Sequence, residues 1–314
     1  MGKNAGPFRL AAEYYAARML VGGMSVLPLG AASWLGARMG DLLRLVDKRH
    51  RRRVYDQVSD RLGLAGEELD RFVKANFRSY GKTLGEFARL SRMRREDFAQ
   101  YVDIEPFKKR LEELRAEGKG VIFITAHFGN WEWNNSLASS LGVSGGSIAR
   151  PLDNPRVNEL VRSVRERNGL RIFDKAGAIR KALGALKDNN LVGILIDQDA
   201  GHNGLMSPFL GKPASTLTVP VELSIRTGSP MVVVGLRRGG SDKRFTLLFN
   251  PRPHRPNPDA DTEQETCRLT DALNEDLGNM IMQAPEQWFW IHRRWKSEGL
   301  KYGRNKTAGD ATAS

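Results

Sequence analysis

The feature that most constrains the fold is an alternation of short apolar runs with amphipathic segments, which begins near residue 105. Runs typical of strands occupy 121–125, 146–150, 191–197, 231–238 and 245–250. Helical patterns lie between and after them, at 106–118, 154–169, 178–190, 215–228 and 261–282. Strands that alternate with helices of this length form a largely parallel sheet. The sequence therefore predicts an α/β fold with a mostly parallel or mixed sheet flanked by helices.

The region before residue 105 has a different character. Residues 19–37 (MLVGGMSVLPLGAASWLGA) carry no charge, and the basic cluster KRHRRR follows at 48–53. A cleavable signal peptide fits poorly, because its positive charges precede the apolar run. A spanning helix needs about 20 apolar residues, so this run is barely long enough, and a buried glycine-rich helix of the core is the alternative. We expect a membrane-associated helix, spanning or interfacial, with the basic cluster at anionic headgroups.

These patterns divide the chain into three parts. Residues 1–53 are expected to form the N-terminal membrane anchor and basic cluster, and 54–303 the α/β domain. Charged and apolar residues alternate at helical spacing over 54–98, so the second part should begin with helices. Residues 304–314 are small and polar, which is typical of a disordered tail.

Charge and cysteine content narrow the possible partners. The chain has 49 Lys and Arg against 36 Asp and Glu, a net charge of +13, so anionic partners are expected. Nucleic acid, an acidic carrier protein and anionic lipid all meet that requirement. Cys267 is the single cysteine, which excludes an internal disulfide and a zinc site built on several thiolates. A cytoplasmic location, or the cytoplasmic side of a membrane, follows from this cysteine usage.

Three polar clusters follow predicted strands. They are AHFGNWEW at 126–133, ARPLDN at 149–154 and DQDAG at 197–201. Sites in open parallel sheets collect beyond the carboxyl ends of strands, so these clusters are expected to share one edge.

The first cluster carries the clearest chemistry. His127 leaves a strand, Gly129 permits a tight turn, and Asn130 is placed to cap a helix that begins near Trp131. His127 and Glu132 can meet across such a junction. A carboxylate bonded to one ring nitrogen raises the basicity of the other, which can then take a proton from a hydroxyl. A zinc site is disfavoured, because the segment lacks a second ligand at helical spacing.

The segment from His127 to Glu132 resembles the acyltransferase motif of a His, four residues, and an Asp or Glu, which glycerolipid acyltransferases share. Its flanks look specifically like the late lipid A acyltransferases, the lauroyl/myristoyl transferase family. Four more passages carry the resemblance in the expected order over roughly residues 10–300: RPLDNP at 150–155, DQDAG at 197–201, SPFLGKPAST at 207–216 and PEQWFWIHRRWK at 285–296.

The resemblance implies an O-acyltransferase whose general base is His127, oriented by Glu132. The acceptor hydroxyl then attacks the donor thioester directly, so no cofactor, metal or covalent enzyme intermediate is expected. The resemblance also implies a substrate-binding set. Arg150 would bind a phosphate or the developing oxyanion, and Asp199 would anchor a basic residue or support the residues behind the site. The rest of the set is Asn130, Arg293 and Arg294.

The implied donor is an acyl carrier protein, and the implied acceptor is a lipid A precursor at the cytoplasmic face of the inner membrane. One departure from the family pattern lies after DQD, where this chain has the residues Ala200, Gly201, His202 and Asn203. It leaves the acceptor and the acyl length open.

Three other functions fit parts of the sequence. An acyltransferase that uses acyl-CoA on another glycolipid, such as a phosphatidylinositol mannoside, fits the same motifs. Asp197-Gln198-Asp199 is also a D-x-D pattern of metal-dependent glycosyltransferases, although that pattern is short and frequent by chance. Nucleic-acid binding would suit the charge, but no helix-turn-helix, zinc-knuckle or RNP-like signature is present, so no nucleic-acid partner is expected.

Overall fold

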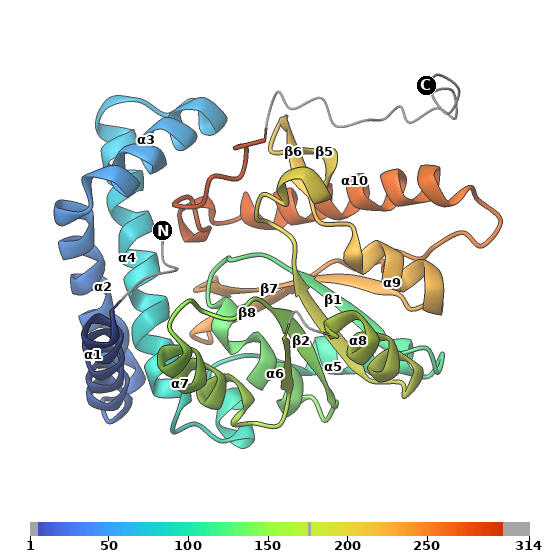
Figure 1. The fold of residues 1–314 in the computed structure, drawn as a ribbon, viewed down its shortest axis with the longest axis horizontal. Helices are drawn as coiled ribbons and strands as arrows, with labels where there is room; N and C mark the ends of the chain where they lie inside the picture. The colour runs from blue at the N-terminus through green and yellow to red at the C-terminus, as the bar shows by residue number, and fades with distance from the viewer. Residues whose placement is uncertain (1–5, 175–176, 241, 298–314) are drawn as a thin grey trace.

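A computed structural model describes residues 6–174, 177–240 and 242–297. Its centre is a six-stranded sheet in the order β3-β2-β4-β1-β7-β8 (Figure 1). The strands are β1 (Val121–Thr125), β2 (Gly145–Ala149), β3 (Arg171–Asp174), β4 (Leu191–Leu195), β7 (Met231–Arg238) and β8 (Phe245–Phe249). All neighbours are parallel except β7 and β8, which are antiparallel. The expected α/β fold with a mixed sheet is confirmed.

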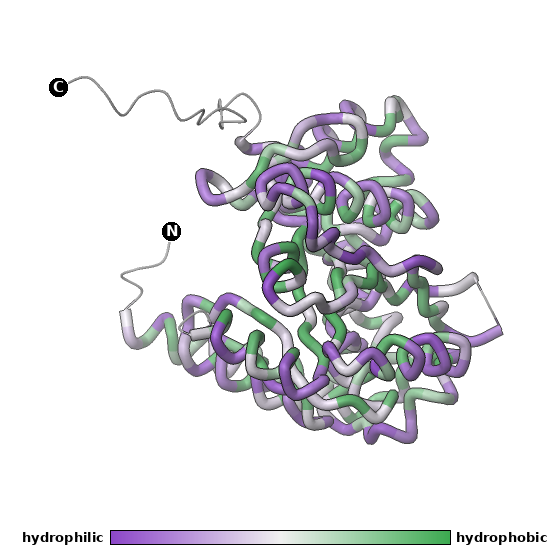
Figure 2. Tube along the Cα trace, turned by 90° about the vertical axis from the view of Figure 1, so that its right-hand side faces the viewer, coloured by the Kyte–Doolittle hydropathy of each residue, from purple (hydrophilic) through white to green (hydrophobic). Residues whose placement is uncertain are grey.

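Helices cover both faces of this sheet. One face packs on α5 (Glu105–Arg115) and α6 (Asn134–Ser140) through Phe123 and Val232. On the other face, Ile124 and Ile194 lie in the core beneath three helices, α8 (Ala178–Lys187), α9 (Val219–Thr227) and α10 (Thr262–Ile281). Alternate residues of a strand point to opposite faces, which is why consecutive residues of β1 serve different cores. Figure 2 shows the hydrophobic segments running mainly through the interior.

The N-terminal helices stand together at one end of the sheet (Figure 1). They are α1 (Pro7–Ser25), α2 (Leu29–Val46), α3 (Lys48–Leu62) and α4 (Gly66–Leu90). The expected helical region over 54–98 is thus confirmed in outline, with a break at Gly63, whose left-handed φ of 67° ends α3. Helix α7 (Pro155–Glu166) lies near α1 and α4.

Helices α2 and α4 approach so closely that their backbones touch. A Cβ at Gly36 would lie 2.1 Å from the carbonyl oxygen of Gly81, and one at Gly40 would lie 2.1 Å from that of Phe77. Gly36 in the apolar N-terminal run and Gly40 just after it therefore serve helix packing, in line with the alternative of a core helix.

The same run is two helices rather than one. Helix α1 ends at Ser25 and α2 begins at Leu29, because Pro28 has no N–H to continue the first helix. Across the parts of the chain that the structure describes, no helix is long and apolar enough to cross a membrane. Helix α2 instead buries one side on α4 and exposes large apolar side chains, Trp34, Leu42, Leu45 and Val46, on the other.

Three details differ from the sequence analysis. Residues 215 and 216 close strand β6 (Lys212–Thr216), the partner of β5 (Leu205–Phe209), so helix α9 begins at Val219 and not at 215. Strand β3 was missed, because four residues give too little pattern. The expected boundary at residue 53 falls inside α3. The expected tail at 304–314 lies outside the described residues.

Short 3₁₀ helices complete the described elements. They are η1 (Arg95–Gln100), η2 (Trp131–Trp133), η3 (Gly201–Asn203) and η4 (Pro285–Gln287). Of these, η2 and η4 flank the site described next.

Candidate active site

His127 lies just beyond the carboxyl end of β1, and Asp197 lies just beyond that of β4. Thr125 pairs with Leu195 in the parallel register of these strands, so each residue follows its paired position by two. The Asp197 carboxylate accepts hydrogen bonds from the His127 backbone N–H at 2.7 Å and from the ring Nδ1 at 2.8 Å. The first and third polar clusters of the sequence therefore meet at one edge of the sheet, as expected.

Asp197 is buried, with 2% of its surface exposed, and it is ionised. Burial by itself would raise the pKa of its carboxyl. The charge of His127 and the hydrogen bonds from His127 and from the Trp288 indole, at 2.9 Å, outweigh burial and lower that pKa to about 2. A carboxylate beside Nδ1 fixes the ring proton on Nδ1, which leaves Nε2 free to accept a proton.

Aromatic rings surround the His127 imidazole. Phe289 stacks on it with the ring centroids 5.4 Å apart, and Trp131 meets it edge-on at 5.4 Å. Tyr80 of α4 stacks in turn on Phe289 at 4.4 Å. The His127 side chain still keeps 21% exposure, so the ring can be reached from solvent. An apolar wall of this kind suits an acyl chain better than a polar substrate.

The C-terminal segment holds this wall in place. The Phe289 N–H donates to the His127 carbonyl at 3.0 Å, and the Gly129 N–H donates to the Gln287 carbonyl at 3.0 Å. Gly129 has a φ of 57°, and a Cβ there would lie 1.9 Å from the Leu236 carbonyl oxygen. Only glycine fits this turn, as the sequence analysis anticipated.

Glu132 does not bond to the His127 ring, contrary to the expectation that it orients the base. Both of its oxygens accept from Arg165 of α7, at 2.8 and 2.7 Å. Burial would raise the pKa of Glu132, but the charge and hydrogen bonds of Arg165, together with the charge of His127, lower it. A guanidinium fork binds both carboxylate oxygens at once and turns the Glu132 carboxylate toward Arg165. Asp197 occupies the position that Glu132 was expected to fill.

Asn130 is fully buried and belongs to a polar network beneath the turn. Its side-chain amide donates to Glu86 at 3.0 Å, and no helix cap is formed by its side chain. Glu86 also accepts from Arg238 at 2.9 Å and from Ser33 at 2.9 Å. The expected cap and substrate contact of Asn130 are therefore replaced by an internal role, which joins α2, α4 and β7 to the turn.

Arg150 and Arg293 are the two predicted basic residues that remain exposed. The Arg150 side chain follows β2, keeps 84% exposure and lies 3.7 Å from Asp153. Arg293 lies on the surface in the segment after Phe289. Both can be reached by an anionic group.

Arg294 is fully buried, so it is out of reach of a headgroup, contrary to expectation. It donates to the carbonyls of Gln198 at 3.1 Å and Ser215 at 2.5 Å, and to the Thr216 hydroxyl at 2.6 Å. Burial lowers its pKa to about 10. Arg294 thus ties the C-terminal segment to the loop after β4 from inside.

Asp199 and His292 also hold this segment. The Asp199 carboxylate accepts from the Ser297 hydroxyl at 2.9 Å and from the Ser297 N–H at 3.0 Å, so it anchors the chain rather than a basic residue. His292 Nε2 accepts from the Asp199 N–H at 2.9 Å, and burial lowers the pKa of His292 to about 4.

The two aspartates of the D-x-D pattern therefore serve different partners, one on His127 and one on Ser297. Over the described ranges, no group of three His, Cys, Asp or Glu side chains is arranged to hold a metal ion.

Three residues of the site were missed from the sequence. Asp197 was noted only within DQDAG and as part of a D-x-D pattern, and not as a partner of His127. Arg165 and Glu86 lie in ordinary amphipathic helices that give no local signal.

Comparison with known proteins identifies the family. Residues 8–297 match the family described as bacterial lipid A biosynthesis acyltransferase. The chain belongs to this family. The resemblance drawn from the five motifs is thereby confirmed, together with the acyltransferase class.

Individual relatives agree with this family. The chain is 27% identical over 286 residues to the lipid A biosynthesis palmitoleoyltransferase of Escherichia coli K12, which covers 86% of this chain and 87% of that protein. It is 25% identical over 277 residues to the lipid A biosynthesis lauroyltransferase of the same organism, with the same shares covered. A lipid A biosynthesis acyltransferase of Haemophilus influenzae is 22% identical over 209 residues, 66% of this chain and 62% of that protein. Acyltransfer to another glycolipid and glycosyl transfer are not favoured by these matches.

Proposed function

We propose that this protein transfers a fatty acyl chain from an acyl carrier protein thioester to a hydroxyl of a lipid A precursor. The observation that carries the proposal is the pair of His127 and Asp197, held at the carboxyl ends of neighbouring parallel strands by a 2.8 Å hydrogen bond. No nucleophile is needed beside this pair, because the acceptor hydroxyl is itself the nucleophile. Family membership supplies the reaction class.

His127 is the general base of the proposed reaction. Its Nε2 takes the proton of the acceptor hydroxyl as that oxygen attacks the thioester carbonyl carbon. The tetrahedral intermediate collapses, the carbon–sulfur bond breaks, and the thiolate leaves with the proton that His127 returns. Asp197 is a positioning residue, because its carboxylate holds the ring and stabilises the imidazolium that forms.

Glu132 and Arg165 support the base without touching its ring. Their bidentate pair closes the wall beside Trp131, and the negative charge of Glu132 attracts the protonated ring of His127. We therefore keep Glu132 in the site as a positioning residue that acts through Arg165 and through charge.

The exposed arginines suit the anionic parts of the substrates. Arg150 follows β2, the neighbour of the strand that carries Asp197, and its guanidinium can bind a phosphate of the acceptor through two hydrogen bonds. Arg293 is proposed for the same kind of contact. The net charge of +13 supports an acidic carrier protein as donor.

The proposed location is the cytoplasmic face of the inner membrane. Support comes from the exposed apolar side chains of α1 and α2, among them Phe8, Met19 and Trp34, which are 88%, 72% and 64% exposed. Large exposed apolar side chains that gather on one surface mark interaction sites.

Acyl transfer by the purified chain in detergent tests the proposal. The donor is an acyl carrier protein thioester, the acceptor is a tetra-acylated lipid A precursor, and no metal is added. We expect transfer by the wild type and a loss of about three orders of magnitude or more in His127→Ala. Equal transfer by both proteins would leave the reaction intact and remove His127 as the base.

Two further assays test the donor and the acceptor separately. Replacing the carrier protein thioester by acyl-CoA should lower kcat/KM, and equal rates would refute the donor assignment. Replacing the lipid A precursor by another anionic glycolipid should abolish transfer, and transfer to that lipid alone would refute the acceptor assignment.

A further inference from the structure

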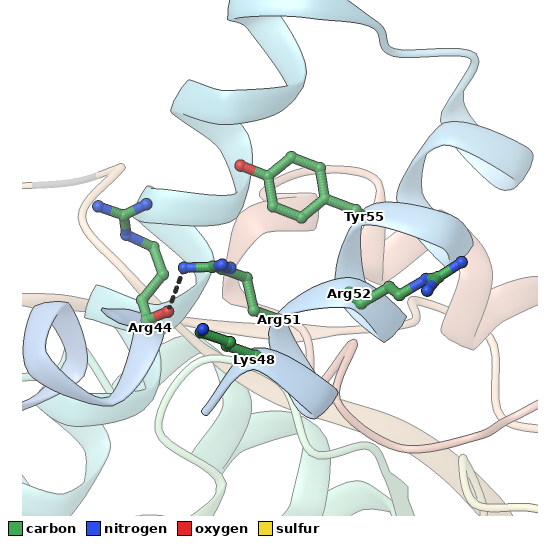
Figure 3. A pocket seen from close by; sticks show the side chains of 5 residues that line it. All are labelled: Arg44, Lys48, Arg51, Arg52 and Tyr55. Atoms are coloured by element: carbon green, nitrogen blue, oxygen red, sulfur yellow. Dashed lines mark hydrogen bonds between the residues drawn. The ribbon is translucent and has the colours of Figure 1, made fainter. Parts of the chain in front are cut away.

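An open cavity of about 430 Å³ lies where α2 meets α3, away from His127. Its lining is almost entirely basic: Arg44, Lys48, Arg51, Arg52 and Tyr55. Figure 3 shows these side chains gathered around the junction, with Arg51 donating to the Arg44 carbonyl at 3.2 Å. Arg44 comes from the end of α2, and the other lining residues come from the first half of α3. The turn between the two helices brings them together.

The carboxylates near this cavity already have partners of their own. Asp47 caps α3 and pairs with His50, Asp41 pairs with Arg78, and Asp70 accepts from Tyr55. Asp56 approaches Arg52 only at 4.0 Å, with both side chains largely exposed. Within the described residues, Arg44, Lys48 and Arg51 form no ion pair with a carboxylate, and the Arg44 Nε is shielded from solvent without a hydrogen-bond partner.

Two of these cations lie close together at the start of α3. Lys48 and Arg51 lie in the first turn of α3, which has no acidic residue. The Asp47 carboxylate already caps this N-terminus, so the positive charge that remains unpaired belongs to the side chains of Arg44, Lys48 and Arg51. These cations repel one another, and an anion bound at the cavity would relieve that repulsion.

The surface beside the cavity is apolar. Leu42, Leu45 and Val46, the last apolar residues of α2, are 60%, 56% and 66% exposed. With Trp34 and Leu35 they recur at helical spacing on the face that is turned away from α4. A basic cavity next to an apolar helix face is complementary to an anionic bilayer, whose phosphates lie directly above its acyl chains.

We propose that this cavity binds the phosphate of an anionic phospholipid, and that the exposed face of α2 enters the bilayer beside it. The site is separate from the acyl-transfer site and sets how the enzyme sits on the membrane. The inference rests on the proposal that the enzyme works at a membrane. Its test uses vesicles without donor or acceptor, so its failure can be told from a failure of the proposed reaction.

The experiment is sedimentation of the full chain with vesicles of phosphatidylcholine alone or with phosphatidylglycerol at physiological salt. The site variant is Arg44→Gln/Lys48→Gln/Arg51→Gln. The control, Arg180→Gln/Lys181→Gln/Lys187→Gln on exposed positions of α8, removes the same charge at the other end of the molecule (Figure 1). Each basic residue near an anionic surface contributes enough that losing three should weaken binding about 100-fold. The control should change binding less than threefold.

Several results would overturn the proposal. An equal loss in both variants would mean that net charge alone attracts the protein to the membrane. Unchanged binding of the site variant would remove the cavity from membrane docking, and calorimetry with inorganic phosphate would then show whether it holds a soluble anion. A tenfold rise in the KM for the acceptor in detergent, with vesicle binding intact, would assign the cavity to the acceptor instead.

The exposed apolar face of α2 is tested with a second variant and a matched control variant. Leu42→Ser/Val46→Ser should lower binding to both kinds of vesicle at least tenfold, because two buried side chains are lost from the bilayer. Leu152→Ser/Ile179→Ser changes two exposed apolar residues elsewhere and should leave binding within twofold. Equal losses in the two variants would contradict insertion of α2.

Discussion

The imidazole of His127 and the carboxylate of Asp197 face each other because their strands are parallel neighbours in register. Thr125 pairs with Leu195, and the two functional residues follow that pair by the same number of positions, 70 residues apart in the chain. Two hydrogen bonds, one from the ring and one from the backbone, fix His127 on a buried, ionised partner. The proposed base is thus held by the sheet itself rather than by the short motif in which it lies.

Replacing Asp197 by Asn should lower kcat for acyl transfer about 100- to 10,000-fold. The amide keeps the shape of the side chain but cannot stabilise the imidazolium. The measurement is the initial rate with a carrier protein thioester, together with circular dichroism to verify folding. Asp199→Asn is the matched control, since Asp199 bonds to Ser297 in the same loop, and its rate should stay within tenfold. A larger loss in the control would place the orienting carboxylate at Asp199.

The lowered pKa of Asp197 predicts an acid-sensitive fold. In the unfolded chain its pKa is near 3.8, and in the folded protein it is about 2. A depressed folded pKa contributes stability that is present above about pH 4 and is lost as the pH falls toward 2. The contribution is on the order of 2 kcal/mol. Urea unfolding at pH 5, 3 and 2 should show this loss, and the slope should be shallower in Asp197→Asn. Identical slopes would contradict the assignment.

Substitutions of Glu132 and Arg165 should have coupled effects on the free energy of unfolding. Arg165→Met leaves a buried carboxylate unpaired and should cost about 3 kcal/mol of unfolding free energy. Adding Glu132→Gln to that variant should recover part of the loss, which a double-mutant cycle measures. The ring partnership of Asp197 predicts that Glu132→Gln keeps more activity than Asp197→Asn. The reverse order of activities would restore Glu132 as the direct partner of His127.

Gly129→Ala should damage both the fold and the reaction. The new Cβ would lie 1.9 Å from the Leu236 carbonyl oxygen, and the residue needs a positive φ. The turn must then shift, and His127 shifts with it, so we expect a loss of about 3 kcal/mol and a rate at least tenfold lower. Gly142→Ala is the control, because Gly142 also has a positive φ but meets open space. Equal effects would show that backbone strain alone, and not the contact with Leu236, matters.

The glycine contact between α2 and α4 should be sensitive to one methyl group. Gly36→Ala places a Cβ 2.1 Å from the Gly81 carbonyl oxygen, which forces the helices apart and should cost about 2–3 kcal/mol. Gly22→Ala in α1 meets no atom within 4 Å and should stabilise the helix by about 0.5–1 kcal/mol. Chemical denaturation of both variants measures the contrast. A neutral Gly36→Ala would mean that the two helices can separate without cost.

Local pattern was enough to predict much of this protein. Periodicity located β1, β4 and β7 and the helices between them. It could do so because the pattern of buried side chains repeats every few residues along each element. The motif from His127 to Glu132 and its companion passages indicated the family, and the edge of the sheet where the site lies followed from strand direction. The turn at Gly129 was also visible, because a glycine after a strand-end histidine is a local signal.

Only the tertiary structure decided which side chains act together. The sequence suggested Glu132 as the partner of His127 because the two are close in the chain, but Arg165, from a helix without any motif, holds Glu132 instead. Arg294 was expected at the surface and lies in the core, because the C-terminal segment folds back on the loop after β4. Contacts of this kind depend on strand register and helix packing across long stretches of chain, which no local pattern records.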